Sequence, residues 1–211
     1  ILVPTRFVAE TFGYCYDWNS SSSTVTITKP LNLFYDNQSV SYTGTQGSVK
    51  FDGKNVNVSN LPSILIANTA MTQAYKVFAK SMGVTYKYSA SKGTVSFTKG
   101  DINLRMELDS NLAYLNDQVV DCGVAPKLVY NEDNKTEAVL VPAQFVAKAL
   151  GYDYNWNSST KTSEIKTTNK VGKEPNITIP PVSPSTPGDG PFSELEYFNW
   201  TSEERYQSVL E

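Results

Sequence analysis

The chain has 211 residues, a net charge of −3 from 18 Lys and Arg against 21 Asp and Glu, and no histidine. Its mild acidity and the lack of a Lys/Arg cluster argue against nucleic-acid binding, because phosphate neutralisation needs a basic face. The missing histidine excludes Ser-His-Asp and Cys-His nucleophiles and imidazole ligands for copper or zinc, and no apolar run approaches the roughly 18–20 residues that span a bilayer.

Three stretches of the chain, residues 1–29, 71–99 and 139–167, align with one another without gaps. In each, a helix-patterned run ends in Ala-x-x-x-Gly, and two aromatic residues follow at alternate positions. The glycines are Gly13, Gly83 and Gly151, and the aromatic pairs are Tyr16/Trp18, Tyr86/Tyr88 and Tyr154/Trp156. A repeat of about 69 residues with one helix and several strands indicates a small module used in series.

The first unit is expected at residues 1–48, with a helix from about Pro4. Its predicted strands cover residues 14–18, 24–28 and 31–35. Because the chain starts at Ile1 in the middle of a repeat and without Met, we expect a trimmed unit that lacks its own hairpin. Such a unit has an incomplete sheet, whose open edge could pair in a dimer or a domain swap.

The second unit is expected at residues 49–111 and the third at 112–170. The second has a hairpin at 49–58 around Asp52-Gly53, an extended segment at 64–66, a helix over 69–82, and strands at 84–88, 94–98 and 102–108. The third has a hairpin at 113–122, a strand at 127–130, a polar loop at 131–137, a helix from about Pro142 to Leu150, and strands at 152–157 and 163–167.

The predicted fold class is therefore α+β, as tandem small modules that each curl an antiparallel sheet around one short α-helix. The repeated aromatics, including Trp18 and Trp156, are expected to close the core over the helix. Beyond the modules, residues 171–191 are rich in proline and are interpreted as a linker. Apolar patterning resumes at 192–211, which is either the start of a further domain or a tail that docks back.

Two runs carry a family resemblance: Val3-Pro4-Thr5-Arg6-Phe7-Val8-Ala9 through Trp18, followed by Thr24-Val25-Thr26-Ile27-Thr28, and Val141-Pro142-Ala143-Gln144-Phe145-Val146-Ala147 through Trp156. They resemble the copper amine oxidase N-terminal-like domain, a stalk module found in tandem on secreted proteins of Gram-positive bacteria. The middle stretch matches more loosely, with Ala74 in place of the proline and Lys76 in place of the arginine. The resemblance covers roughly residues 1–168, with no match past residue 170.

The resemblance implies a stalk fold and a place outside the cell membrane. It carries over no catalytic residue, because in the oxidases the metal and the quinone cofactor belong to a separate catalytic domain. The absence of histidine agrees with this, so we expect no cofactor and no tight copper site.

The remaining candidate groups are explained more simply by structural roles than by catalysis or metal binding. Cys15 and Cys122 are either a disulfide or, as the strand pattern favours, two separate thiols. Arg6 and Glu10 are spaced for a surface ion pair on one helix. The remaining candidates are the Ser-x-x-Lys strings at Ser89–Lys92 and Ser158–Lys161, which lie in expected strand–strand turns, and the loop Asn131-Glu132-Asp133-Asn134, which lacks the pattern of a calcium loop. If aromatics outside the repeat pattern meet a glycan, Tyr35 and Tyr42 are the candidates.

Two functions follow as hypotheses. In the first, the chain is a non-catalytic extracellular stalk, spacer or adhesion module at the cell surface. It would hold a neighbouring domain or bind weakly to cell-wall polysaccharide or a surface protein. In the second, it positions a secreted enzyme, such as a cell-wall hydrolase or peptidase, whose catalytic domain lies after residue 211. In both, this chain itself is not an enzyme.

Overall fold

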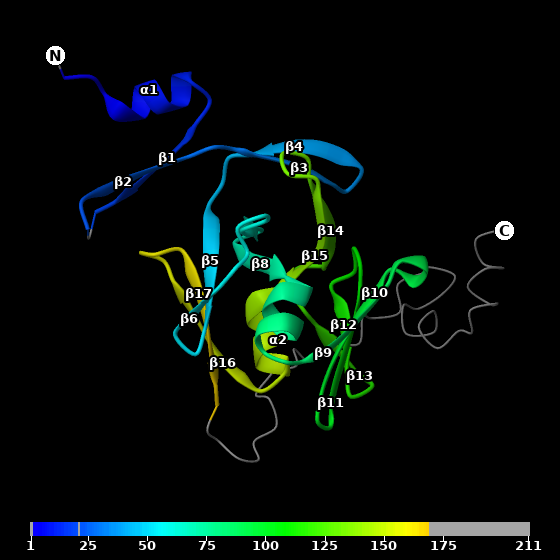
Figure 1. Cartoon of the computed structure of the whole chain (residues 1–211). Helices are drawn as coiled ribbons and strands as arrows, with labels where there is room; N and C mark the ends of the chain where they lie inside the picture. Colours follow the sequence, from blue (N-terminus) through cyan, green and yellow to red (C-terminus); the bar gives the residue numbers. More distant parts are fainter. Residues whose placement is uncertain (1, 21, 169–211) are drawn as a thin grey trace, which may run out of the picture. The chain divides into compact units, whose positions relative to one another are not determined.

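The computed structural model of the protein describes residues 2–20 and 22–168. All of them lie in one compact unit. The expected linker at 171–191 and the expected domain or tail at 192–211 lie outside the described residues and stay predictions, as do the unit boundaries. Figure 1 labels helices and strands in chain order.

Three short helices occur at the same positions within the three repeats. They are α1 (Thr5–Thr11), the π-helix η1 (Tyr75–Ser81) and α2 (Ala143–Ala149); a 3-10 turn, η2 (Ala90–Lys92), follows the second. Each helix is followed by a glycine with positive φ, +75° at Gly13, +69° at Gly83 and +75° at Gly151. The left-handed region favours glycine, which ends the helix and lets a hairpin follow. The predicted helix stops are confirmed.

The middle helix differs from the other two because Ala74 replaces the proline before it. Pro4 and Pro142 have φ/ψ of −62°/106° and −63°/106°, outside the helix, whereas Ala74 is helical at −54°/−52°. The same span to the glycine therefore holds one more helical residue. The wider turns of a π-helix take up the extra residue. The bond after the helix is longer to match: Val84 N to Phe78 O spans six residues, where the equivalent Tyr14 N to Ala9 O spans five.

Within the described residues, the strands form three sheets. The two-stranded sheet contains β1 (Cys15–Asn19) and β2 (Thr24–Thr28). The five-stranded sheet runs β13 (Gln118–Asp121), β12 (Leu112–Leu115), β11 (Ile102–Glu107), β10 (Thr94–Lys99), β9 (Thr85–Ser89). The ten-stranded sheet runs β16 (Tyr152–Asn157), β17 (Thr162–Thr167), β5 (Gln46–Phe51), β7 (Ser63–Ile66), β8 (Thr69–Gln73), β15 (Thr136–Pro142), β14 (Lys127–Asn131), β3 (Leu31–Tyr35), β4 (Gln38–Tyr42), and β6 (Lys54–Val56) pairs with β5.

The predicted fold class is wrong in its architecture. The described residues are mostly strand, in three sheets with only three short helices, rather than tandem modules that each curl a sheet around one helix. The local pieces were predicted correctly, because all three helix-glycine-hairpin segments are present. The error concerns how these pieces join.

Strands of the second and third units complete one another's sheets. β5 pairs in parallel with β17, which lies more than 100 residues later, and Ser48 is opposite Thr162 in that register. β8 pairs antiparallel with β15, with Gln73 opposite Leu140. Figure 1 shows β5 alongside β17 and β8 near β15. The two units therefore share a sheet and are not separate modules in series.

One predicted helix is too long. The sequence pattern placed a helix over 69–82, but residues 69–73 form β8, and only 75–81 are helical. β8 lies between β7 and β15, so its backbone is hydrogen-bonded on both sides. These long-range pairs outweigh the local helical pattern, since strand formation is decided largely by neighbouring strands.

β5 changes partners along its length at Gly47. Gln46 and Gly47 pair with β7, and residues 48–51 pair with β17. A Cβ at Gly47 would lie 2.8 Å from Lys161 O and 3.3 Å from Trp156 Cη2. Only glycine allows this close approach between the backbones.

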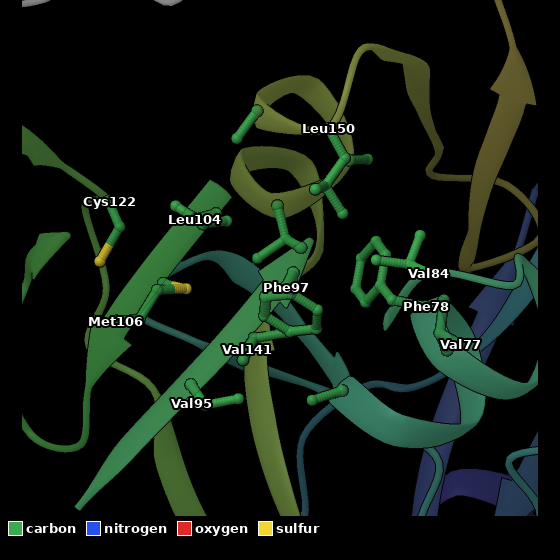
Figure 2. Close-up of a cluster of buried hydrophobic side chains, with 14 of the residues drawn as sticks. Val77, Phe78, Val84, Val95, Phe97, Leu104, Met106, Cys122, Val141 and Leu150 are labelled. Carbon is green, nitrogen blue, oxygen red and sulfur yellow. The ribbon is translucent and has the colours of Figure 1, made fainter. Parts of the chain in front are cut away.

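The core is formed by two clusters of buried side chains. The larger cluster contains side chains of both η1 and α2, among them Phe78 and Val146, with Leu150 directly after α2 and strands of the five- and ten-stranded sheets. Figure 2 shows Phe78, Phe97 and Leu150 in this cluster. The rings of Phe78 and Phe97 meet edge to face at 5.5 Å. A smaller cluster collects Leu33, Leu61, Ile64, Met71, Val129 and Leu140.

The first repeat contributes to neither cluster. Among its described residues 2–28, only Ala9 is buried. α1 packs against β1, and β1 pairs with β2 alone. The first helix and hairpin thus have the same local fold as the other two, but they are not packed into a core cluster.

Candidate functional site

An aromatic groove of 220 Å³ lies at the start of η1, and we call it the tyrosine groove. Its walls are Tyr75, Tyr86 and Tyr88 with Asn60, Gln73, Lys76, Leu128, Thr136, Glu137, Ala138 and Val139. These residues come from η1, β8, β9, β14 and β15 and from the residue Asn60 between β6 and β7. The rigid sheets therefore fix most of its wall.

The three tyrosines are placed by two local rules. Tyr86 and Tyr88 alternate along β9 and so point to the same face of the sheet. Tyr75 is the first residue of η1, is 58% exposed, and its ring centroid lies 5.9 Å from that of Tyr86. Tyr86 in turn lies against Phe97 of the core. One open aromatic face is thus supported by a second, partly buried ring.

Gln73 supplies the polar side of the groove and is only 3% exposed. Its Nε2 donates to Leu61 O at 2.5 Å, and more weakly to Asn60 Oδ1 at 3.3 Å and Val58 O at 3.4 Å. Those acceptors fix the amide orientation, because the reverse orientation would set oxygen against oxygen. Among residues 2–20 and 22–168, no donor hydrogen-bonds to Gln73 Oε1. This oxygen can accept a hydrogen bond from a bound hydroxyl.

Burial is the main cause of the pKa shifts of the titratable groups at the groove. Burial, with a smaller contribution from Tyr88, raises the pKa of Tyr86 to about 12. Its hydroxyl therefore stays protonated at neutral pH and can donate a hydrogen bond. Burial and then the neighbouring Lys80 lower the pKa of Lys76, whose ammonium donates to Asn60 Oδ1.

The groove suits recognition more than bond cleavage. Glu137 is the one carboxylate in its lining, whereas acid–base hydrolysis of a glycosidic bond uses a pair. Within the described part of the chain, no group of three His, Cys, Asp or Glu residues could hold a metal ion. Aromatic faces with amide and hydroxyl groups can instead bind a neutral polar ligand such as a sugar ring.

A second groove, of 430 Å³, is lined mainly by hydroxyl and amide side chains, and we call it the hydroxyl groove. Thr24, Thr26 and Thr28 lie on one face of β2 and line it with Ser159 and Thr160 of the turn between β16 and β17. Asn19 Nδ2 donates to Ser159 O at 2.6 Å, and Lys161 lies 3.8 Å from Asp17. These contacts hold the β1–β2 hairpin to that turn.

Comparison with known protein families matches the copper amine oxidase N-terminal domain twice, over residues 1–75 and 50–165. The chain belongs to this family. No curated protein and no solved structure matches it. The domain is a non-catalytic accessory domain of its family, so the coarse prediction of a stalk-like part without chemistry of its own is supported.

The family's name raises the question of copper, and the side chains of this member do not fit that ion. Copper sites in proteins use imidazole, often with thiolate, and the chain has no histidine. Cys15 and Cys122 are separate free thiols, so the predicted alternative of two thiols is confirmed and the disulfide is wrong. Burial, followed by Asp121, raises the pKa of Cys122 to about 12, which disfavours the thiolate.

Neither of the predicted glycan candidates lines either groove, although Tyr42 contacts Thr45 in the wall of the hydroxyl groove. Tyr35 ends β3 and Tyr42 ends β4, and each packs partly buried against the smaller core cluster. The Tyr42 hydroxyl accepts from Leu65 N at 2.8 Å and donates to Thr45 O at 3.0 Å. Burial raises the pKa of Tyr42. These bonds give Tyr42 a structural role, and glycan binding by either residue stays a prediction.

Other predicted groups are found in their simpler roles. Arg6 and Glu10 form an exposed ion pair at 3.9 Å, as predicted. In the 131–134 loop, Asp133 accepts from Asn32 N at 3.0 Å, and its pKa is lowered chiefly by that bond. The loop therefore binds β3 of its own chain. Both Ser-x-x-Lys strings lie between strands, one running from the end of β9 into η2 and the other between β16 and β17.

The sequence interpretation of the repeated aromatics holds for the second unit of this family member, holds in part for the third and fails for the first. In the third unit, Trp156 is partly buried but belongs to neither core cluster. Tyr86, Tyr88 and Tyr154 pack against the larger cluster. Trp18 is 49% exposed, since nothing from the main core reaches it. Tyr75 was not among the predicted site residues; the sequence pattern placed it on the apolar face of the 69–82 helix. The signal was present in the alignment, because Thr5 and Ala143 occupy its position in the other two repeats.

The absence of a spanning helix agrees with the sequence. No helix among the described residues is long and apolar enough to cross a membrane.

Proposed function

We propose that this chain is an extracellular spacer, a non-catalytic stalk at the cell surface that holds a neighbouring domain at a fixed distance. The carrying observation is the shared ten-stranded sheet. In it, β5 pairs with β17 and β8 pairs with β15, although the strands of each pair lie about 70 residues or more apart in the chain. Backbone hydrogen bonds thus tie the two matched segments together. The role is the same whether the neighbouring domain is an enzyme or a binding module.

Side chains reinforce these long-range pairs. Ser48 Oγ and Thr162 Oγ1 are 2.9 Å apart across the β5–β17 pair. At the far end, Asp52 accepts from Thr167 N at 2.8 Å and from Thr167 Oγ1 at 2.7 Å. A spacer benefits from such cross-links, because separately folded modules would bend at their joints.

Hydrogen exchange tests the rigidity. Amides of β5, β8, β15 and β17 should exchange together, at the rate set by global unfolding, and calorimetry of the chain should show one main transition. Two transitions, with residues 49–111 and 112–167 exchanging independently, would contradict the spacer. Protease treatment of intact cells that express the native gene tests the location, since only a surface protein is digested without lysis.

We also propose a weak adhesive role for the tyrosine groove, with cell-wall polysaccharide as its ligand. The exposed Tyr75 ring, the Tyr86 hydroxyl and the unpaired Gln73 oxygen provide one stacking face and two polar groups in a small space. Sugar rings offer both apolar C–H faces and hydroxyls to such an arrangement. Repeated weak contacts along a polymer would add through avidity.

The test is sedimentation with purified peptidoglycan and titration with its soluble fragments. Tyr75→Ala should weaken binding about tenfold, the loss expected for one aromatic contact. Tyr14→Ala removes a tyrosine of similar exposure outside the groove and should leave binding unchanged. An equal loss in both variants, or no binding by the unaltered chain, would exclude the adhesive role and leave the spacer role standing.

A further inference from the structure

The first repeat carries an exposed apolar surface, which we call the first-segment face. It consists of Leu2, Val3, Phe7, Phe12, Tyr14, Trp18 and Ile27. Phe7 is 67% exposed and Phe12 is 74% exposed. Such a concentration of large apolar side chains is unusual for a free surface and is typical of an interface.

The repeat itself shows that these positions are made for burial. Phe12 corresponds to Met82 and Leu150, and Ile27 corresponds to Phe97 and Ile165. Leu150, Phe97 and Ile165 are completely buried, and Met82 is packed against the larger cluster. These positions of the same local fold are therefore buried in the second and third repeats and exposed in the first.

In the other two repeats, the second strand of the hairpin pairs with a further strand. β10 continues its sheet through β11, and β17 continues through β5. In the part of the chain that the structure describes, β2 pairs with β1 alone, so its other edge is open. Both the apolar side chains and the backbone edge of the first repeat lack the partners that their equivalents have.

One internal contact provides a geometric template for the missing partner. β8 and β15 enter η1 and α2, and these two strands pair antiparallel with Val141 opposite Thr72 and Leu140 opposite Gln73. In the first repeat, Leu2 is equivalent to Thr72 and Leu140, and Val3 to Gln73 and Val141. Applied to two copies of the first repeat, this register sets Leu2 of each copy opposite Val3 of the other. The pairing is thus self-complementary about a two-fold axis.

We propose that two copies of this chain associate through the first-segment face, by antiparallel pairing of Leu2 and Val3 that repeats the β8–β15 contact. α1 of one copy then packs against the strand of the other, as α2 packs against β8 within the chain. The self-complementary register favours a second copy as the partner, and charge does not oppose it. Arg6 and Glu10 make the exposed side of α1 neutral, so two copies do not repel each other.

Sedimentation equilibrium of the chain 1–211 over a range of concentrations measures the association. A reversible dimer is expected, and Phe12→Ser should raise its dissociation constant by tenfold or more. Because Phe12 is exposed and outside the core clusters, this variant should keep the melting temperature of the unaltered chain. Phe34→Ser is the matched control, an exposed phenylalanine in β3 outside the first-segment face, and should dimerise normally. A monomer at all concentrations, or equal effects of both variants, would overturn the proposal.

Cysteine cross-linking tests the register. In a Cys15→Ser background, Leu2→Cys and Val3→Cys chains are prepared separately; Cys122 is retained because it is buried. Mixing the two chains under mild oxidation should give a disulfide-linked dimer in higher yield than either chain alone, because position 2 faces position 3 across the axis. Equal yields, or no cross-link in a chain that still dimerises, would refute the strand pairing. Neither result depends on the spacer or adhesive role.

Discussion

A single position can change the role of a repeated segment. Thr5 and Ala143 begin α1 and α2, whereas Tyr75 begins η1 and opens the tyrosine groove. Its neighbour Ala74 replaces a proline and widens the helix into a π-helix, a form found often at functional sites. The two departures from the repeat lie side by side. The groove thus lies where the second repeat departs from the sequence of the other two.

The two thiols should react very differently. Cys122 is buried in the core and its pKa is raised to about 12, whereas Cys15 is half-buried and lines the hydroxyl groove. Near pH 8, a disulfide reagent such as Ellman's should therefore modify about one thiol in the folded chain and two after unfolding. Cys15→Ser should remove the fast-reacting thiol. Fast reaction of both thiols in the folded state would contradict the buried position of Cys122.

At the scale of elements, the modular prediction failed because strands of different units pair with one another. Each hairpin formed as its turn predicted, including the one around Asp52-Gly53. The partner of that hairpin is β17 from the third unit. A turn sequence fixes which two strands pair locally, but it carries no information about which distant strand adds to the edge.

The pairing of β5 with β17 depends on Gly47. Gly47→Ala would place a methyl group 2.8 Å from the backbone oxygen of Lys161, so β5 and the 158–161 turn must separate. We expect a loss of about 1–3 kcal/mol in the free energy of unfolding, the usual cost of overpacking.

Urea unfolding of Gly47→Ala measures this loss, with Lys54→Ala on the exposed side of the same hairpin as the control. The control should change the free energy of unfolding by less than about 0.5 kcal/mol. An unchanged midpoint for Gly47→Ala would mean that the two backbones are not in close contact.

At the scale of the molecule, the chain divides into a core and an attached first repeat. Both core clusters draw on residues 31–165 alone. The first repeat is held by contacts such as Asn19 to Ser159 and Asp17 to Lys161, which are exposed and individually weak. Folding of the core should not require it.

Deletion of residues 1–28 should therefore leave a cooperatively folded protein with a melting temperature within a few degrees of the unaltered chain. Residue 29 is kept because Gln46 Nε2 donates to Lys29 O. By contrast, a chain ending at Lys161 lacks β17, including the fully buried Ser163 and Ile165, and should not unfold cooperatively. Circular dichroism melts compare the two; loss of the transition in the first deletion would contradict this division.

The sequence by itself determined the local structure. The Ala-x-x-x-Gly signature placed the three helices and their ends, the Asp52-Gly53 and Asn116-Asp117 turns placed two hairpins, and the family followed from these patterns. Such features depend on neighbours a few residues apart, so periodicity and turn chemistry reveal them. The helix predicted over 69–73 was wrong because pairing with β7 and β15 makes that segment a strand.

Only the tertiary structure decided which strands share a sheet, and with them the tyrosine groove and the exposure of the first-segment face. The groove combines Asn60, Gln73, Tyr88 and Glu137, which the sequence scatters over two units. Phe12 and Leu150 have equivalent places in the repeat, yet one is exposed and the other buried. Local sequence specifies an apolar face, but whether that face is covered depends on distant strands whose pairing is a property of the whole fold.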